Sequence, residues 1–209
     1  MSGQAAPGPI TVMIAEDQTM MSSALASLLQ LEEDLRVVAL VARGDEVIDA
    51  VAAHRPDVLL LDIELPGRSG LDLLADVLAG SPGTEVVVVT TFGRTGYLRR
   101  AMDGGARGFL VKDRPVTALA AAIRRAAEGE SVIDPDLAAR ALTAGPNPLT
   151  GRERDVLVAA EGGAPIAEIA RTLHLSQSTV RNYLSSAIGK TSARNRAEAL
   201  GIAREQGWL

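Results

Sequence analysis

The chain has 209 residues, 47% of them hydrophobic, which is enough for two ordinary domains that each bury a core. It has no cysteine and only two histidines, His54 and His174, so disulfide bonds and zinc–thiolate sites are excluded and a histidine metal cluster is disfavoured. No apolar run approaches about 18 residues, and residues 1–9 lack the pattern of a signal peptide. We therefore expect a flexible N-terminal arm at residues 1–9, no membrane insertion and a cytoplasmic location.

The formal net charge of −5 is unevenly distributed along the chain. Residues 1–129 carry 12 Lys and Arg against 17 Asp and Glu, whereas residues 149–209 carry 8 against 6. The segment from Ile169 to Ala197 contains no acidic residue. An acidic front and a basic rear segment indicate two domains with different partners.

Residues 10–128 alternate between two kinds of segment. Short β-branched runs predict five strands, at 10–15, 36–41, 57–61, 85–91 and 108–111. The Ala- and Leu-rich stretches between them have a helical period and predict five helices, at 18–33, 45–54, 69–80, 95–104 and 115–128. This alternation predicts an α/β domain with a doubly wound, five-stranded parallel sheet of the flavodoxin type, covered on both faces.

The rest of the chain has a different character. Residues 129–148 include three of the ten prolines and are predicted to be a linker, with a short helix at 135–143. Residues 149–209 contain no strand-like run and are predicted to form a small all-α domain of about four helices.

Polar side chains follow the predicted strands at one edge of the sheet. Glu16 and Asp17 follow the first strand, and Asp62 follows the third. Thr90 ends the fourth strand, and Lys112 follows the fifth. Such strand ends converge on one crevice, where doubly wound folds bind ligands. Three carboxylates with no His or Cys suit Mg²⁺, which binds oxygen ligands together with phosphate.

Each of these residues also has an ordinary structural explanation. Glu16 and Asp17 could cap the following helix, and Thr90 could simply fit a strand. Phe109 could be plain core, and Lys112 alone could be a surface lysine. Only the joint placement at four strand ends favours a functional site.

Residues 10–128 resemble the receiver domain of two-component response regulators, through Glu16-Asp17, Asp62 with Pro66-Gly67 following, Thr90 and Lys112. The resemblance implies that Asp62 accepts a phosphoryl group from a sensor histidine kinase. It implies a Mg²⁺ site whose ligands are Glu16, Asp17, Asp62 and the backbone carbonyl of Glu64. It also implies that Lys112 pairs with the phosphate, that Thr90 hydrogen-bonds to it and that Phe109 is a switch aromatic.

The stretch IAEIARTLHLSQSTVRNYL, residues 166–184, predicts a helix, a tight turn and a second helix. Ser176 is a good N-cap for the second helix. A buried stripe through Val180 and Leu184 leaves an opposite face that is polar, small and free of acids: Ser178, Arg181, Asn182, Ser185 and Gly189. Such a face suits a reader of the DNA major groove, although an ordinary solvated helix is the simpler alternative.

Together with PLTGRERDVL at 148–157 and SARNRAEAL at 192–200, this stretch resembles the LuxR-type helix-turn-helix of NarL/FixJ regulators. The resemblance covers residues 149–209. It implies that Arg181, Asn182 and Ser185 face bases. It implies contacts with the DNA backbone for Ser176, Ser178, Thr179, Lys190, Arg194 and Arg196. Tyr183 stands where many members of this family have histidine, and Thr191-Ser192 where Leu-Gly is common.

The combined interpretation is a phosphorylation-controlled transcription regulator, with no enzymatic activity beyond phosphorylation and dephosphorylation of its own Asp62. The expected partners are a sensor histidine kinase, a double-stranded DNA operator and a second copy of the chain, with RNA polymerase as a further candidate. Phosphorylation is expected to favour the homodimer and its binding to the operator. One alternative is a dimeric regulator that works without phosphorylation, which labelling with acetyl phosphate would distinguish. Another is a Mg²⁺-dependent phosphohydrolase with Glu64 as general acid, but no lid-sized insertion is evident and the DNA-reading segment would be unexplained.

Overall fold

The computed structural model describes residues 8–91, 93–113, 115–143 and 147–209. Most of the flexible arm predicted at residues 1–9, and residues 144–146 of the predicted linker, lie outside the described residues. Contacts divide the chain into two units, Met1–Gly93 with Leu98–Leu137 and Arg94–Tyr97 with Ala138–Leu209. Each unit has its own hydrophobic core.

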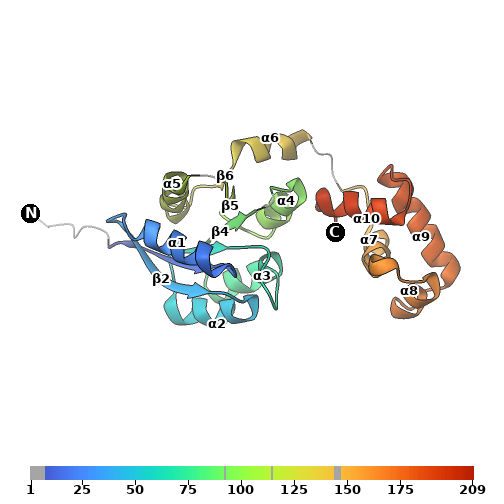
Figure 1. The fold of residues 1–209 in the computed structure, drawn as a ribbon, viewed down its shortest axis with the longest axis horizontal. Helices are drawn as coiled ribbons and strands as arrows, with labels where there is room; N and C mark the ends of the chain where they lie inside the picture. Colours follow the sequence, from blue (N-terminus) through green and yellow to red (C-terminus); the bar gives the residue numbers. More distant parts are fainter. Residues whose placement is uncertain (1–7, 92, 114, 144–146) are drawn as a thin grey trace, which may run out of the picture. The chain divides into compact units, whose positions relative to one another are not determined.

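The first unit is built on a six-stranded parallel sheet in the order β2-β1-β3-β4-β5-β6 (Figure 1). Its strands are β1 (Ile10–Ala15), β2 (Leu35–Val41), β3 (Val58–Leu61), β4 (Glu85–Thr90), β5 (Gly108–Val111) and β6 (Val132–Ile133). The prediction of five strands was therefore wrong by one. β6 has only two residues, too few to show a period, and it lies in the segment predicted as linker.

Five helices follow the first five strands: α1 (Thr19–Leu29), α2 (Gly44–His54), α3 (Gly70–Gly80), α4 (Thr95–Asp103) and α5 (Val116–Ala127). α1 and α5 share a core cluster with alternate strand residues such as Val12 and Ile14, so these two helices cover one face. Met13 and Ala15, which point to the other face, are also buried. Burial on both faces explains why the strands are continuous apolar runs. After β6 comes α6 (Pro135–Thr143), in agreement with the short helix predicted there.

The order of the strands creates a crevice at their carboxyl ends. From β1 the chain passes to β2 on one side, and from β3 it passes to β4 on the other side. The loops after β1 and β3 therefore diverge, and such a reversal leaves space for a ligand between them. Glu16 is the first residue after β1, and Asp62 is the first residue after β3.

Gly70, the first residue of α3, lies against the backbone of Asp62. A Cβ atom added at Gly70 would lie 2.1 Å from the Asp62 carbonyl oxygen, which the backbone cannot accommodate without moving. We expect Gly70→Ala to lower the free energy of unfolding by roughly 2–3 kcal/mol and to weaken phosphorylation of Asp62. Urea unfolding followed by circular dichroism would measure the first effect.

Gly80→Ala is the matched control, because it lies at the other end of the same helix and an added Cβ meets nothing within 4 Å. It should leave stability unchanged or raise it by up to about 1 kcal/mol. Equal stabilities of the two variants would contradict the tight contact at Gly70.

The second unit contains a helical domain. Its elements are α7 (Gly151–Ala159), the 3-10 turn η1 (Glu161–Gly163), α8 (Ile166–Thr172), α9 (Gln177–Lys190) and α10 (Arg196–Glu205). The core includes Val156 and Leu157 from α7, Ile169 from α8 and Val180 and Leu184 from α9. The prediction of about four helices is confirmed. Among the described residues, no helix is both long enough and apolar enough to cross a membrane.

Candidate functional site

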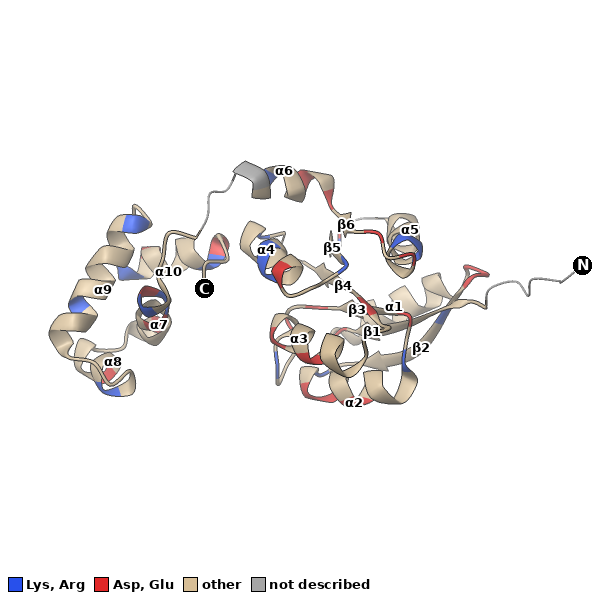
Figure 2. Cartoon of the chain, turned by 180° about the vertical axis from the view of Figure 1, so that it is seen from behind, with Lys and Arg blue, Asp and Glu red and all other residues tan. Residues whose placement is uncertain are grey.

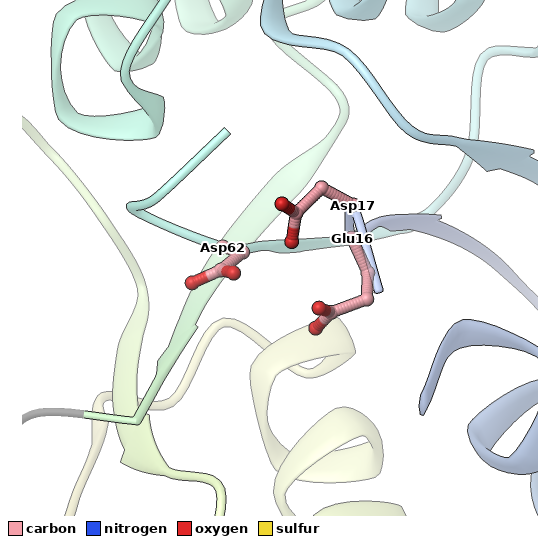
Figure 3. A group of neighbouring side chains, drawn as sticks. All are labelled: Glu16, Asp17 and Asp62. Carbon is pink, nitrogen blue, oxygen red and sulfur yellow. The ribbon is translucent and has the colours of Figure 1, made fainter. Parts of the chain in front are cut away.

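The structure brings together the three acids predicted at the strand ends. Glu16, Asp17 and Asp62 each offer a carboxylate oxygen, and these oxygens all lie within 4.8 Å of one another. Figure 3 shows the three side chains converging from the ends of β1 and β3. Glu16 and Asp62 are only 3% and 4% exposed, whereas Asp17 is exposed.

The sheet register explains this convergence. Ala15 of β1 pairs with Leu61 of β3, so the next residue of each strand, Glu16 or Asp62, leaves the sheet at the same level. The Asp62 amide donates to the Ala15 carbonyl at 3.0 Å, which fixes the backbone of the predicted phosphoacceptor. A one-residue slip of β3 would turn the Asp62 side chain away from Glu16.

Lys112 completes this cluster from the end of β5. Its ammonium lies 2.8 Å from Asp62 Oδ2 and 2.5 Å from Glu16 Oε2, and its side chain is 7% exposed. Burial alone would lower the pKa of Lys112, but hydrogen bonds and charges from Asp62 and Glu16 outweigh it and raise that pKa. Lys112 is therefore a charged group held against the predicted phosphoacceptor, and the interpretation as an ordinary surface lysine was wrong.

The donor set fits a magnesium ion. Asp62 Oδ1 is the only buried side-chain nitrogen or oxygen, among those the structure describes, that lacks a hydrogen-bond partner. Such an unpaired oxygen is costly to bury unless a cation or ligand meets it. The exposed Asp17 lies beside it, and the donors are all oxygen, which Mg²⁺ prefers. Neither acid is the N-cap of α1, which is Gln18, and the first turn contains no acid. Glu16 does contact the start of the helix, because its Oε1 accepts the Gln18 amide at 3.2 Å.

The remaining predicted receiver residues lie at the end of β4, in β5 and in the loop after β3. Thr90 and Phe109 are both fully buried, at the end of β4 and in β5. Phe109 also pairs with Ile133 of β6, and its carbonyl accepts the Asp134 amide at 3.2 Å. Burial fits both a core residue and a switch aromatic, so the role of Phe109 stays a prediction. Glu64, whose carbonyl was predicted as a metal ligand, is exposed in the loop after β3.

The predicted recognition helix is α9. Ser176 is its N-cap, and its hydroxyl accepts the Thr179 amide at 3.1 Å, as the sequence predicted. Ser178, Arg181, Asn182 and Ser185 are exposed. Figure 2 shows basic but no acidic residues along α9. The structure adds Gln177, whose side-chain oxygen accepts a hydrogen bond from the Arg181 guanidinium at 3.3 Å and can orient it.

Three basic residues predicted to meet the DNA backbone have partners within their own domain. The Lys190 ammonium lies 2.8 Å from Glu153 Oε2, and Arg194 pairs with Glu198 on the following helix. Arg196 donates to the carbonyl oxygens of Gly163 and Ala164, at the turn before α8. Their contacts with DNA stay a prediction, which must now include exchange of these partners for phosphate.

Glu153 was not singled out from the sequence. It is only 4% exposed and forms a capping box with Thr150 at the start of α7. The pattern Thr150-x-x-Glu153 is the usual signature of such a box, but it does not reveal the contacts with Ser186 and Lys190. Burial opposes the charge of Glu153, but hydrogen bonds from Lys190, Ser186 and Thr150 prevail and lower its pKa to about 2.

The lowered pKa of Glu153 predicts an acid-sensitive domain. A carboxylate whose pKa is lower in the folded than in the unfolded chain stabilises above its unfolded pKa, and this is lost as the pH falls. From about pH 4.5 down to about pH 2 the loss should reach roughly 2 kcal/mol, after discounting for the part-exposed Lys190. Trp208, the only tryptophan of the chain, packs on the core of this domain, so its fluorescence reports unfolding there. Glu153→Gln should flatten the acid dependence, and an unchanged slope would contradict the lowered pKa.

Comparisons with known proteins find relatives of both the sheet domain and the helical domain. A family model of the response regulator receiver domain matches residues 12–124, and a model of bacterial regulatory proteins of the luxR family matches residues 147–203. The chain is 44% identical over 200 residues to the uncharacterized transcriptional regulatory protein YvfU of Bacillus subtilis (strain 168), covering 96% of this chain and 100% of that protein. It is 41% identical over 200 residues to the transcriptional regulatory protein DesR of the same organism, covering 96% and 99%.

Solved structures show the same fold. The response regulator ChrA of a heme-sensing two-component system matches with a TM-score of 0.57 at 30% identity, covering 97% of this chain and 100% of that one. RcsB from Salmonella enterica serovar Typhimurium, bound to promoter DNA with the phosphomimetic BeF₃⁻, matches with a TM-score of 0.71 at 24% identity, covering 95% and 99%. The chain belongs to the two-component response regulators that join a receiver domain to a LuxR-type DNA-binding domain, and it is a DNA-binding transcription regulator.

Proposed function

We propose that a sensor histidine kinase phosphorylates Asp62 and that this phosphorylation controls reading of an operator by α9. The observation that carries the proposal is that one chain contains both parts of such a switch. Asp62 and Lys112 form a buried pair in which one carboxylate oxygen of Asp62 is unpaired, and the exposed face of α9 carries no acidic residue. Reading of DNA requires access to the chromosome, so we place the protein in the cytoplasm.

In the proposed transfer, one carboxylate oxygen of Asp62 attacks the phosphorus of a phosphohistidine. The P–O bond forms as the P–N bond breaks, and the imidazole of the kinase leaves and is protonated by solvent. Glu16, Asp17, Asp62 and the carbonyl of Glu64 would hold Mg²⁺, which supplies positive charge to the phosphoryl oxygens.

Lys112 is placed to stabilise the aspartyl phosphate formed on Asp62. Its ammonium already contacts Asp62 Oδ2, so it needs only a small movement to pair with a phosphate on that residue. The Lys112 amide donates to the Thr90 carbonyl at 2.9 Å, which ties the ends of β5 and β4 together. Thr90 would hydrogen-bond to the phosphate, and Phe109 would fill the space that Thr90 leaves.

A surface on α1 supports dimerisation as the output of this switch. The 11 residues of α1 contain no charge, and Met20 and Leu28 are 86% and 42% exposed. Leu31, just after the helix, is 78% exposed. The other exposed residues of α1 are Thr19, Ser23, Ala24 and Ser27, so a second copy can pack on this face without burying a charge. A second copy would supply the second reading helix that paired DNA half-sites require.

Analytical ultracentrifugation tests the dimerisation. Beryllofluoride with Mg²⁺ should tighten self-association of the wild-type chain by about tenfold or more and should leave Asp62→Ala unchanged. Met20→Asp should abolish the gain, whereas Leu40→Asp, which places the same charge at a 47% exposed leucine of β2, should retain it. An unchanged association constant at full occupancy of Asp62 would refute dimerisation as the switch.

A further inference from the structure

Glu153 joins the first helix of the DNA-binding domain to the helix predicted to read DNA. We infer that Glu153 is a positioning residue for sequence recognition: its buried carboxylate sets the rotation of α9 about its own axis. The inference rests on the proposed base-reading role of α9. Glu153 itself is buried and has no access to DNA.

Both oxygens of the Glu153 carboxylate are engaged. Oε2 accepts the Thr150 amide at 2.6 Å and the Lys190 ammonium at 2.8 Å. Oε1 accepts the Ser186 hydroxyl at 2.6 Å. Thr150 belongs to the start of α7, whereas Ser186 and Lys190 lie one turn apart on α9. The Glu153 side chain therefore makes one contact at the N-cap of its own helix and two contacts with α9.

These contacts add a directional restraint to the packing of α9 on the hydrophobic core. Val180, Leu184 and Ala187 hold α9 against the core through dispersion and burial, which depend little on direction. Hydrogen bonds weaken steeply with angle, and those to a charged group are the strongest kind. The bonds to Ser186 and Lys190 therefore narrow the range of helix rotations that the core packing allows.

The rotation of α9 decides which groups reach the bases. Arg181, Asn182 and Ser185 are exposed on α9, and Ser185 is the immediate neighbour of Ser186. A bidentate contact between a side chain and a base edge requires fixed direction as well as distance. Loss of the Glu153 carboxylate should therefore impair discrimination between DNA sequences more than it impairs binding to DNA in general.

The same geometry changes the expected role of Lys190. The Lys190 ammonium forms an ion pair with the buried Glu153, so it must leave that carboxylate in order to bind a DNA phosphate. If phosphate binding were its only role, Glu153→Gln would release the ammonium, strengthen binding to every sequence and leave discrimination unchanged. A positioning role predicts the opposite, a loss of discrimination.

The test compares full-length variants on two DNA duplexes: one enriched from random-sequence DNA with the wild-type chain, and one scrambled version of equal composition. Glu153→Gln and Lys190→Met should each lower the ratio of the two affinities by about tenfold. The double variant should lower it no further than either single variant, because both act through one contact. Ser186→Ala, which keeps all charges, should give a smaller loss in the same direction.

Glu161→Gln is the matched control, since it removes an equal charge from an exposed ion pair with Arg204 in the same domain. It should leave the ratio unchanged. Trp208 fluorescence establishes that each variant is folded at the assay temperature, so that lost stability is separated from lost positioning. If folded Glu153→Gln has the wild-type ratio of affinities for the two duplexes, the positioning inference is refuted and the proposed function is not. If Glu153→Gln does not fold, a wild-type ratio for Ser186→Ala refutes it in the same way. A wild-type chain that does not discriminate would refute the DNA-reading function itself.

Discussion

Asp62→Asn should reduce phosphorylation by acetyl phosphate to background, whereas the wild-type chain is labelled at this one residue. The reason is the combination of a buried carboxylate with an unpaired Oδ1 and a Lys112 ammonium on Oδ2. An amide nitrogen is not a phosphoryl acceptor, and asparagine has nearly the same shape. Phos-tag electrophoresis and mass spectrometry of the labelled chain measure the effect.

Two controls define the outcome of the Asp62 experiment. Asp76→Asn, an exposed acid of α3 that pairs with Arg68, should be labelled like the wild type. EDTA should suppress labelling of the wild type, because three adjacent carboxylates and a phosphoryl donor repel one another without a cation. Labelling of Asp62→Asn at the wild-type level would move the phosphoacceptor to another residue.

Arg181→Ala should flatten discrimination between the enriched duplex and its scrambled counterpart by about 5- to 150-fold. That range corresponds to the 1–3 kcal/mol typical of one bidentate arginine–guanine contact. Arg181 is exposed on α9, and its hydrogen bond from Nη2 to Gln177 holds the guanidinium along the helix. Fluorescence anisotropy with both duplexes, over a range of salt concentrations, measures affinity and salt dependence together.

Arg204→Ala is the control for Arg181, because it removes the same charge from α10, where Arg204 is paired with Glu161. It should alter both affinities little and leave their ratio intact. A side chain that met only phosphate would weaken both duplexes equally and reduce the salt slope by about one unit. Such a pattern for Arg181 would assign it to the DNA backbone and not to a base.

Much of the receiver fold could be predicted because the strands are continuous apolar runs separated by segments of helical period. β1 and β5 have the predicted bounds, and β3 ends at Leu61, so that Asp62 follows it directly. The two-residue β6 could not be predicted, because its stability comes from hydrogen bonds to β5 and not from its own sequence pattern. α1 ends at Leu29, four residues before the predicted end. The prediction was too long because the apolar pattern continues past Leu29 to Leu31, which is exposed.

The acid cluster could be predicted because parallel strands bring their carboxyl ends to one edge whatever the loops do. The partner that a long side chain finds on another helix could not be predicted from the sequence. Lys190 and Glu153 are far apart in the sequence, and nothing in their local patterns indicates that one neutralises the other. The contact of Lys190 with the DNA backbone stays a prediction, to which the structure adds the ion pair with Glu153.

The most direct test is the affinity for the enriched duplex with and without beryllofluoride and Mg²⁺, measured by fluorescence anisotropy for the wild type and Asp62→Asn. If occupancy of Asp62 controls reading by α9, the wild-type affinity should rise about tenfold or more and the variant should not respond. A wild-type chain that is fully occupied at Asp62 and binds the duplex with unchanged affinity would contradict phosphorylation control.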